Sequence, residues 1–192
     1  MDSTGVFPSP NGVHILRKGF MLSLSLFLFP FITFAVDRAP DYVEYISDLV
    51  AAHAGPPVIL SKDDVAATKA TFKPPVEILI DAMTDSTNLR MSYAAKAVIF
   101  NWERNRTELR VDGGPAGGKH KPGAGGIPTN KFVSIHWVVT PTRQTIEVDG
   151  LTRYQHFGDY SKIDNPIAVF CAHGSQVTVK SIKVRQLPAD SQ

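Results

Sequence analysis

Alternation of apolar and polar residues with a period of two runs through most of the chain after Pro57 and constrains the fold more than any other feature. Successive side chains of a β-strand point to opposite faces, so this pattern predicts strands with one buried and one solvated face. The alternating segments are 88–93, 97–103, 107–112, 131–140, 145–149 and 177–184. The phase slips once in the last of them, which predicts a bulge. Together with 76–82 and 167–171 they amount to eight or nine expected strands.

Turn signals separate these segments and no convincing helix follows residue 56, so we expect an all-β fold, an antiparallel sandwich or jelly roll. Asp149-Gly150 stands between two strand-like runs and predicts a tight hairpin, because glycine accepts positive φ freely and aspartate tolerates it. Pro74-Pro75 precedes the run at 76–82, a place where a strand tolerates proline.

The N-terminal region indicates export. Residues 19–36 are almost wholly apolar and uncharged, and Arg17-Lys18 stands directly before them, the arrangement of a signal peptide. Small residues at Thr33 and Ala35 favour cleavage after Ala35, although a stretch of 18 residues is also just long enough to span a bilayer if it is not cleaved. We therefore expect residues 1–35 to be a signal peptide or an N-terminal membrane anchor. The protein would be secreted, periplasmic or at the cell surface, with 19–36 as the anchoring segment if it is retained.

A short helix is expected between this region and the strands. Apolar residues recur at steps of three and four within 41–54, and Gly55-Pro56-Pro57 forms a firm stop. A plain tether is the alternative for so short a segment. The expected organisation is thus a signal or anchor over 1–35, a short helix and linker over 36–56, and a β-sandwich over 57–188.

Composition narrows the possible partners. Lys and Arg total 20 against 18 Asp and Glu, a balance that argues against nucleic acid as a partner. Cys171 is the single cysteine, which excludes an internal disulfide, and the six histidines show no ligand spacing. We therefore predict no metal and no cofactor, although the loop 159–164 carries acidic residues of unspecific spacing that leave calcium open.

Residues 113–120 resemble the spacing of a phosphate-binding loop, but they lack the Ser or Thr that binds magnesium and the helix that receives the phosphates. They instead suggest a mobile hairpin loop.

The polar face of the strands holds the candidate binding residues. If the strands adjoin in one sheet, their guanidinium, amide, carboxylate and imidazole groups form one patch of the kind that recognises sugar hydroxyls. The residues expected to bind a ligand are Arg90, Asn101, Glu103, Arg110 and His136. Trp102, Trp137 and Tyr154 are candidate stacking platforms, but alternation places both tryptophans in the core. An ordinary solvated face with salt bridges is the alternative.

Two acid pairs deserve comparison with the catalytic pair of a glycosidase. Glu147 and Asp149 are two residues apart and so share one strand face, but the turn that follows suits a hairpin better. Glu103 with Glu108 or Asp112 would serve a glycoside hydrolase or lyase, and pairing with nearby arginines is the commoner outcome. No catalytic residue is predicted.

Several motifs carry a resemblance to a known superfamily. They are FKPPVEI (72–78), VIFNWE (98–103), GGIPTNKFVSI (125–135), IEVDG (146–150) and SQVTVKSIKVR (175–185). The run from 72 to 187 resembles the concanavalin A-like lectin/glucanase superfamily, and within it the laminin-G-like or bacterial domain-of-unknown-function jelly rolls of secreted proteins. These motifs mark turns and core strands, so the resemblance implies the fold more strongly than the activity.

The resemblance implies a carbohydrate-binding or accessory module, and the alternating acids of the glucanases have no counterpart here. We expect an exported, non-catalytic, lectin-like module that binds a polysaccharide or a cell-surface glycan. It would meet a membrane only through an uncleaved N-terminal segment. A glycoside hydrolase or lyase, and a structural or adhesion module that binds another protein, are the alternatives.

Overall fold

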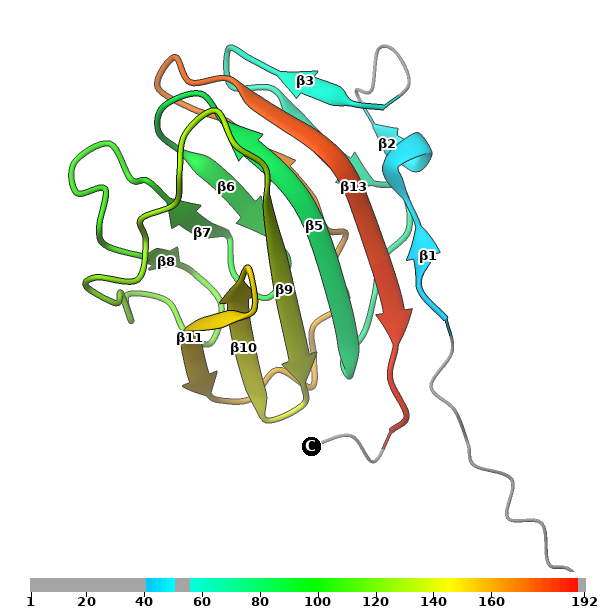
Figure 1. Ribbon diagram of the computed structural model, residues 1–192. Coiled ribbons are helices and arrows are strands. Elements are labelled where there is room, and N and C mark those ends of the chain that lie inside the picture. Colours follow the sequence, from blue (N-terminus) through cyan, green and yellow to red (C-terminus); the bar gives the residue numbers. More distant parts are fainter. Residues whose placement is uncertain (1–40, 51–55, 190–192) are drawn as a thin grey trace, which may run out of the picture. The chain divides into compact units, whose positions relative to one another are not determined.

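The computed structural model describes residues 41–50 and 56–189, and all structural statements refer to these residues. They form an all-β fold, as expected from the alternation (Figure 1). In chain order the elements are β1 (Val43–Glu44), the 3-10 turn η1 (Ile46–Asp48), β2 (Leu49–Val50), β3 (Val58–Leu60), β4 (Val65–Thr68), β5 (Val76–Thr84), β6 (Leu89–Ser92), β7 (Ala97–Phe100), β8 (Arg110–Asp112), β9 (Val133–Thr140), β10 (Arg143–Val148), β11 (Leu151–Phe157), β12 (Ala168–Phe170) and β13 (Val177–Gln186). Within this described part, no helix is long and apolar enough to cross a membrane. The apolar segment 19–36 lies outside it.

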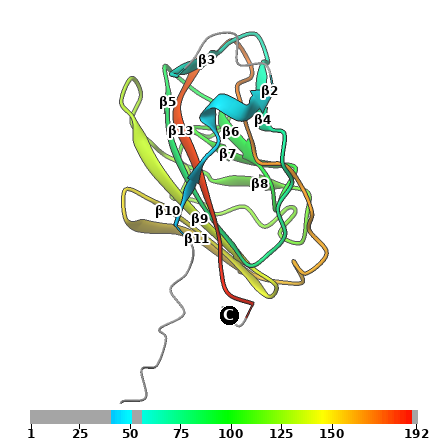
Figure 2. The same cartoon turned by 90° about the vertical axis from the view of Figure 1, so that its right-hand side faces the viewer.

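The strands form two antiparallel sheets that pack as separate layers (Figure 2). Sheet A has the order β1-β13-β5-β9-β10-β11, with β3 also paired to β13. Sheet B has the order β2-β4-β12-β6-β7-β8. Strands distant in sequence are neighbours in both sheets: β13 pairs with β5, and β12 lies between β4 and β6.

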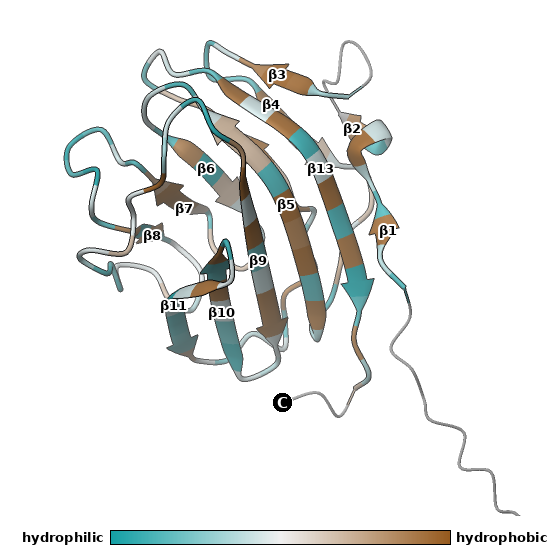
Figure 3. Cartoon of the chain, viewed as in Figure 1, coloured by the Kyte–Doolittle hydropathy of each residue, from teal (hydrophilic) through white to brown (hydrophobic). Residues whose placement is uncertain are grey.

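Alternate residues of the strands meet in the core between the sheets, and Figure 3 shows the alternation along β5, β9 and β13. Ile78 and Ile80 of β5 are fully buried, as are Ile135 and Trp137 of β9. The Trp137 indole Nε1 donates to Gln144 Oε1 at 3.0 Å, which satisfies the polar atom of a large core side chain. The register of β13 shifts between Val179 and Ser181, where the sequence predicts a bulge.

The predicted hairpin at Asp149-Gly150 is confirmed. Both residues have positive φ, 51° and 77°, and they join β10 to β11. Asp149 Oδ1 also accepts a hydrogen bond from the backbone N–H of Ser134 at 2.9 Å, which ties the turn to β9. This carboxylate is therefore part of the turn structure.

The described part of the segment 41–54 is not the expected helix. It crosses from one sheet to the other, since β1 pairs with β13 of sheet A and β2 pairs with β4 of sheet B. A Glu44 carboxylate oxygen accepts from the backbone N–H groups of Ile46 and Ile182, at 3.0 and 2.9 Å. The three-residue step from Ile46 to Leu49, both buried, fits one 3-10 turn between two strands as well as a helix face. Residues 51–54 lie outside the described part.

The glycine-rich loop after β8 is tied to the sandwich. The backbone N–H of Val111 donates to His120 Nδ1 at 3.0 Å, and the Tyr154 hydroxyl donates to the Lys119 carbonyl at 2.8 Å. Ala116 within the loop is fully buried. These contacts connect the loop to β8 of sheet B and to β11 of sheet A, and among the described residues no helix follows the loop to receive a phosphate.

Candidate functional site

A hollow of about 250 Å³ lies on the outer face of sheet B, over β6, β7 and β8. We call it the polar hollow. It is lined by Arg90, Ile99, Trp102, Glu103, Arg104, Arg110, Asp112 and His173. Three residues of the predicted binding set, Arg90, Glu103 and Arg110, meet here. The sheet register explains this meeting, because Ile99 of the central strand is the lateral partner of both arginines.

Each arginine is oriented by a residue two positions away along the chain. Arg90 Nε and Nη2 donate to Asn88 Oδ1 at 3.1 and 2.9 Å. Arg110 Nε donates to Asp112 Oδ2 at 2.8 Å, and hydrogen bonding to that carboxylate raises the pKa of Arg110. The guanidinium groups are therefore fixed in direction, which lowers the conformational entropy that a ligand contact would cost.

Trp102 lines the hollow, whereas alternation places it in the core. Strand β7 ends at Phe100, and Asn101 has a φ of 48°, so the alternation stops one residue before the tryptophan. The half-buried indole lies under the guanidinium of Arg110, whose Cζ is 4.5 Å from the ring centroid. The asparagine before the tryptophan is the sequence signal that indicates this break, because asparagine accepts positive φ more readily than most residues. Trp137, by contrast, is in the core as expected.

Glu103 lies between two basic groups. Its Oε2 is 3.7 Å from Arg90 Nη2, and its Oε1 is 3.4 Å from Nε2 of His173. Oε2 is buried and has no hydrogen-bond partner among the described residues. Burial alone would raise the pKa of Glu103, but its own backbone N–H and the nearby His173 and Arg90 lower it below the usual value of 4.5. The group is thus a carboxylate at neutral pH with an acceptor atom to spare.

His173 was missed by sequence reasoning. It follows β12, in the turn before β13, and has a φ of 54°. His173 and Gly174 form an ordinary turn pair, and nothing in the nearby sequence indicates that β12 lies beside β6. Only the pairing of distant strands brings this imidazole to Glu103.

Asn101 does not line the hollow. Its side chain is turned into the protein, where Oδ1 accepts from the Ile127 N–H and Nδ2 donates to the Ile127 carbonyl, both at 2.9 Å. Its backbone N–H donates to the carbonyl of Gly125. Asn101 is 3% exposed and holds the long loop against the end of β7. Of the aromatic candidates, Tyr154 is also buried.

His136 lies on the outer face of sheet A, because β9 pairs with β5 and β10. Its Nε2 is 2.5 Å from Glu77 Oε1 and its Nδ1 is 3.3 Å from Glu147 Oε2. Glu77 also accepts from Arg185 Nε at 2.7 Å. Burial would raise the pKa of Glu77, but hydrogen bonds from Arg185, Tyr42 and His136 lower it. The continuous patch of the sequence analysis is therefore divided between two sheets.

The other acids considered at the sequence level are engaged in local contacts. Both Asp112 oxygens contact Arg110 Nε, at 3.1 and 2.8 Å. Glu108 accepts from Asn105 Nδ2 at 3.4 Å, and Glu147 accepts from the Thr152 hydroxyl as well as contacting the imidazole of His136.

The acidic loop before β12 is held by local contacts too. Asp159 Oδ1 accepts from the backbone and hydroxyl of Ser161, at 3.0 and 2.6 Å. Asp164 forms an ion pair with Lys73 at 3.4 Å. Over 41–50 and 56–189, no three His, Cys, Asp or Glu side chains are grouped to hold a metal ion.

Comparison with known proteins identifies the fold. No protein-family description matches the chain, and no curated protein matches it in sequence. Among solved structures, a β-glucanase from Bacillus licheniformis superposes with a TM-score of 0.55 at 9% identity, covering 79% of this chain and 90% of that one. A native glycosidic hydrolase gives 0.54 at 12% identity with coverages of 79% and 90%. A putative glycosyl hydrolase from Parabacteroides distasonis gives 0.53 at 11%, covering 77% of this chain and all of that one.

At such low identities the likeness concerns architecture alone. The fold is the concanavalin A-like jelly roll, as the motifs between 72 and 187 imply.

Proposed function

We propose that this chain is an exported, non-catalytic carbohydrate-binding module that holds a polysaccharide or a cell-surface glycan in the polar hollow. The observation that carries the proposal is Glu103 Oε2, a buried carboxylate oxygen without a hydrogen-bond partner among the described residues. A buried acceptor left without a donor costs about 1–3 kcal/mol, and this cost is recovered when the partly exposed Glu103 side chain turns toward the hollow and a ligand hydroxyl donates to it.

The chemistry around Glu103 suits sugar hydroxyls. Arg90 and His173 present donors beside the acceptor, and Trp102 supplies an apolar surface in the same hollow. Paired donors and acceptors on a partly apolar surface are what vicinal hydroxyls of a sugar require. Solved proteins of the same fold, among them the β-glucanase, carry names that refer to carbohydrates, which supports this ligand class.

Two observations favour binding over hydrolysis. A glycosidase needs a carboxylic acid with a raised pKa, whereas the pKa of Glu103 is lowered. Its possible partner Asp112 contacts Arg110 Nε with both oxygens, so that carboxylate is already engaged within the protein.

Hydrolysis or lyase chemistry remains the second candidate, because Glu103 and Asp112 line the same hollow. Reducing-end or unsaturated-product assays on every glycan that binds will separate the two functions, and turnover lost in Glu103→Gln would establish the enzyme.

The test of binding uses the purified full chain on an immobilised glycan panel, with and without calcium. Arg90→Ala and Glu103→Gln should each weaken binding at least tenfold, since each removes a charged hydrogen-bonding group worth about 1.5–3 kcal/mol. Arg106→Ala is the matched control, because Arg106 is an exposed arginine of the loop that also carries Glu103, and it does not line the hollow. Binding that survives both hollow variants, or no binding across the panel, would overturn the proposal.

A further inference from the structure

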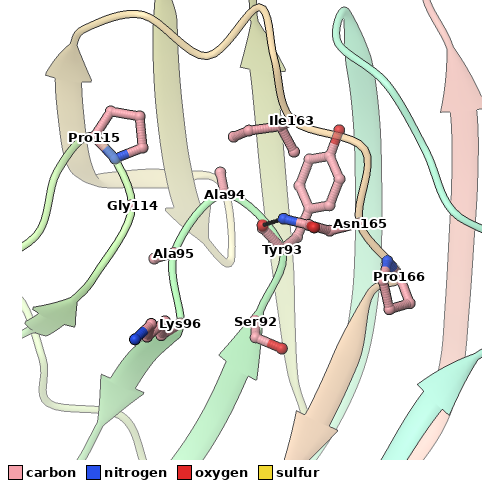
Figure 4. Close-up of a pocket in the computed structure, with 10 residues that line it drawn as sticks. All are labelled: Ser92, Tyr93, Ala94, Ala95, Lys96, Gly114, Pro115, Ile163, Asn165 and Pro166. Atoms are coloured by element: carbon pink, nitrogen blue, oxygen red, sulfur yellow. Dashed lines mark hydrogen bonds between the residues drawn. The ribbon is translucent and has the colours of Figure 1, made fainter.

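A second hollow, of about 340 Å³, lies at the opposite end of β6 (Figure 4). We call it the apolar hollow. The turn between β6 and β7, the loop after β8 and the loop before β12 surround it. It is lined by Ser92, Tyr93, Ala94, Ala95, Lys96, Gly114, Pro115, Ile163, Asn165 and Pro166. Most of this lining is carbon, in contrast to the polar hollow.

The three segments are fixed against one another. A Cβ at Gly114, whose φ is 68°, would lie 2.2 Å from the carbonyl oxygen of Ala94, so only glycine permits this approach of the loop to the β6–β7 turn. Asn165 Nδ2 donates to the Tyr93 carbonyl at 2.9 Å and ties the third segment to the same turn (Figure 4). The Tyr93 hydroxyl donates to the Phe72 carbonyl at 3.2 Å. The hollow is therefore preformed.

Two polar groups at the hollow have unused hydrogen-bonding capacity. Because Asn165 Nδ2 donates to the Tyr93 carbonyl, its Oδ1 is an acceptor, and no donor among the described residues contacts it. The hydroxyl of Ser92 likewise has no partner in the described part of the chain, and it both donates and accepts. Ala94, Pro115 and Ile163 supply the apolar walls around these two groups.

From this combination we infer that the apolar hollow takes the acetamido group of an N-acetylated amino sugar. An acetamido group presents one N–H donor, one carbonyl acceptor and one methyl group. Asn165 Oδ1 accepts from the N–H, the Ser92 hydroxyl donates to the carbonyl, and the methyl group packs against Ala94 and Ile163. The inference rests on the proposed function, since it names the sugar class that the polar hollow would hold.

The two hollows are close enough for one ligand. Ser92 follows Arg90 by two residues on the outer face of β6, because Leu89 and Met91, which alternate with them along the strand, are buried. Two residues of a strand span about 7 Å. A glycan chain in both hollows therefore runs along β6, and its acetamido group lies next to the unit that contacts Arg90 and Glu103.

The experiment compares two trisaccharides of the same β-1,4 linkage by isothermal titration calorimetry on the full chain. Chitotriose, taken as the trimer of N-acetylglucosamine, carries acetamido groups where cellotriose carries hydroxyls. We expect chitotriose to bind about tenfold more tightly, given one buried methyl group and two added hydrogen bonds. Ser92→Leu fills the hollow and should abolish the difference, while Ser92→Ala removes only the hydroxyl and should reduce it about threefold.

Ser134→Leu is the matched control, because Ser134 lies on the outer face of sheet A and should leave the preference unchanged. Thermal unfolding of each variant verifies that it is folded. Equal binding of both sugars, or a preference that persists in Ser92→Leu, overturns the acetamido assignment.

Failure of the acetamido assignment can be distinguished from failure of the proposed function. Arg90-dependent binding of a panel glycan other than chitotriose would keep the polar hollow and remove the acetamido assignment. Absence of any Arg90-dependent binding would remove both.

Discussion

The outer faces of the two sheets use the same side-chain chemistry in opposite ways. On sheet A, Glu77 contacts Arg185, His136 and Tyr42, so its carboxylate is saturated with donors. On sheet B, Glu103 lies between Arg90 and His173, yet its Oε2 makes no hydrogen bond within the described residues. The side chain of Glu77 is 11% exposed and that of Glu103 is 25% exposed.

The difference separates stabilisation from recognition. A carboxylate whose partners are all supplied by the protein adds to the stability of the fold and offers little to a ligand. A carboxylate held by longer contacts, with one oxygen unsatisfied, gains from a ligand that donates to it. Residue type alone does not distinguish the two faces, since each has glutamate, histidine and arginine.

The largest expected effect concerns the two glutamates. Glu77→Gln should lower the free energy of unfolding by about 3 kcal/mol, because Arg185 and His136 lose a mostly buried charged partner. Glu103→Gln should change it by less than about 1 kcal/mol, since its contacts are longer. Urea denaturation followed by tryptophan fluorescence measures both. Equal losses of stability would show that the two faces do not differ in the way the contacts indicate.

Asn101 and Arg90 test the same distinction within sheet B. Asn101→Ala should cost about 2 kcal/mol of unfolding free energy, as two hydrogen bonds to Ile127 are lost at a residue with positive φ. Glycan binding by the folded fraction should remain. Arg90→Ala should show the reverse, with weakened binding and stability within about 1 kcal/mol of the original. Loss of binding in a folded Asn101→Ala protein would show that Asn101 contributes to binding, either directly or by fixing the position of Trp102.

Acid should act on sheet A more than on sheet B. The pKa values of Glu77 and Glu103 are both lowered in the folded protein from a usual value of 4.5. Each therefore contributes stability that is present above pH 4.5 and is lost as the pH falls through the folded-state pKa. Unfolding free energies measured from pH 6 to pH 3 should decline less steeply in Glu77→Gln than in Glu103→Gln. If the unfolding free energy of Glu77→Gln fell with decreasing pH as steeply as that of the original protein, the contacts of Glu77 would not account for the effect of acid on stability.

The two histidines give the smallest effects. His136→Gln should lower stability by about 1 kcal/mol and leave binding unchanged, because the imidazole bridges Glu77 and Glu147 far from the hollow. His173→Gln should weaken glycan binding about threefold and leave stability within about 0.5 kcal/mol, since the side chain is 56% exposed. Calorimetric titration and denaturation of the same two proteins provide both readouts.

Much of the sandwich was predictable because strand alternation and turn chemistry are local. Val133, Ile135, Trp137 and Val139 are buried as their spacing requires, and Asp149-Gly150 forms the expected hairpin. Local patterns misled where two structures share one spacing. The three-residue step from Ile46 to Leu49 suits a helix and also suits one turn between two strands, and pairing with β13 and β4 favours the strands.

The candidate site was predictable only in part. Arg90, Glu103 and Arg110 were identified because alternation places all three on the polar face of the expected strands. The two arginines do lie on β6 and β8, whereas Glu103 lies three residues beyond the end of β7. His136 satisfies the same rule but belongs to a strand of the other sheet. Trp102 enters the hollow because Asn101 takes a positive φ, and His173 enters it because β12 pairs with β6.

The sequence by itself therefore determined which residues alternate, where the hairpin turns and which side chains are polar. These properties depend on neighbours within a few positions of the chain. Only the tertiary structure decided which strands share a sheet, and so which carboxylate is saturated and which is left open. Strand pairing joins residues more than a hundred positions apart, such as Glu77 and Arg185, and no short stretch of sequence encodes it.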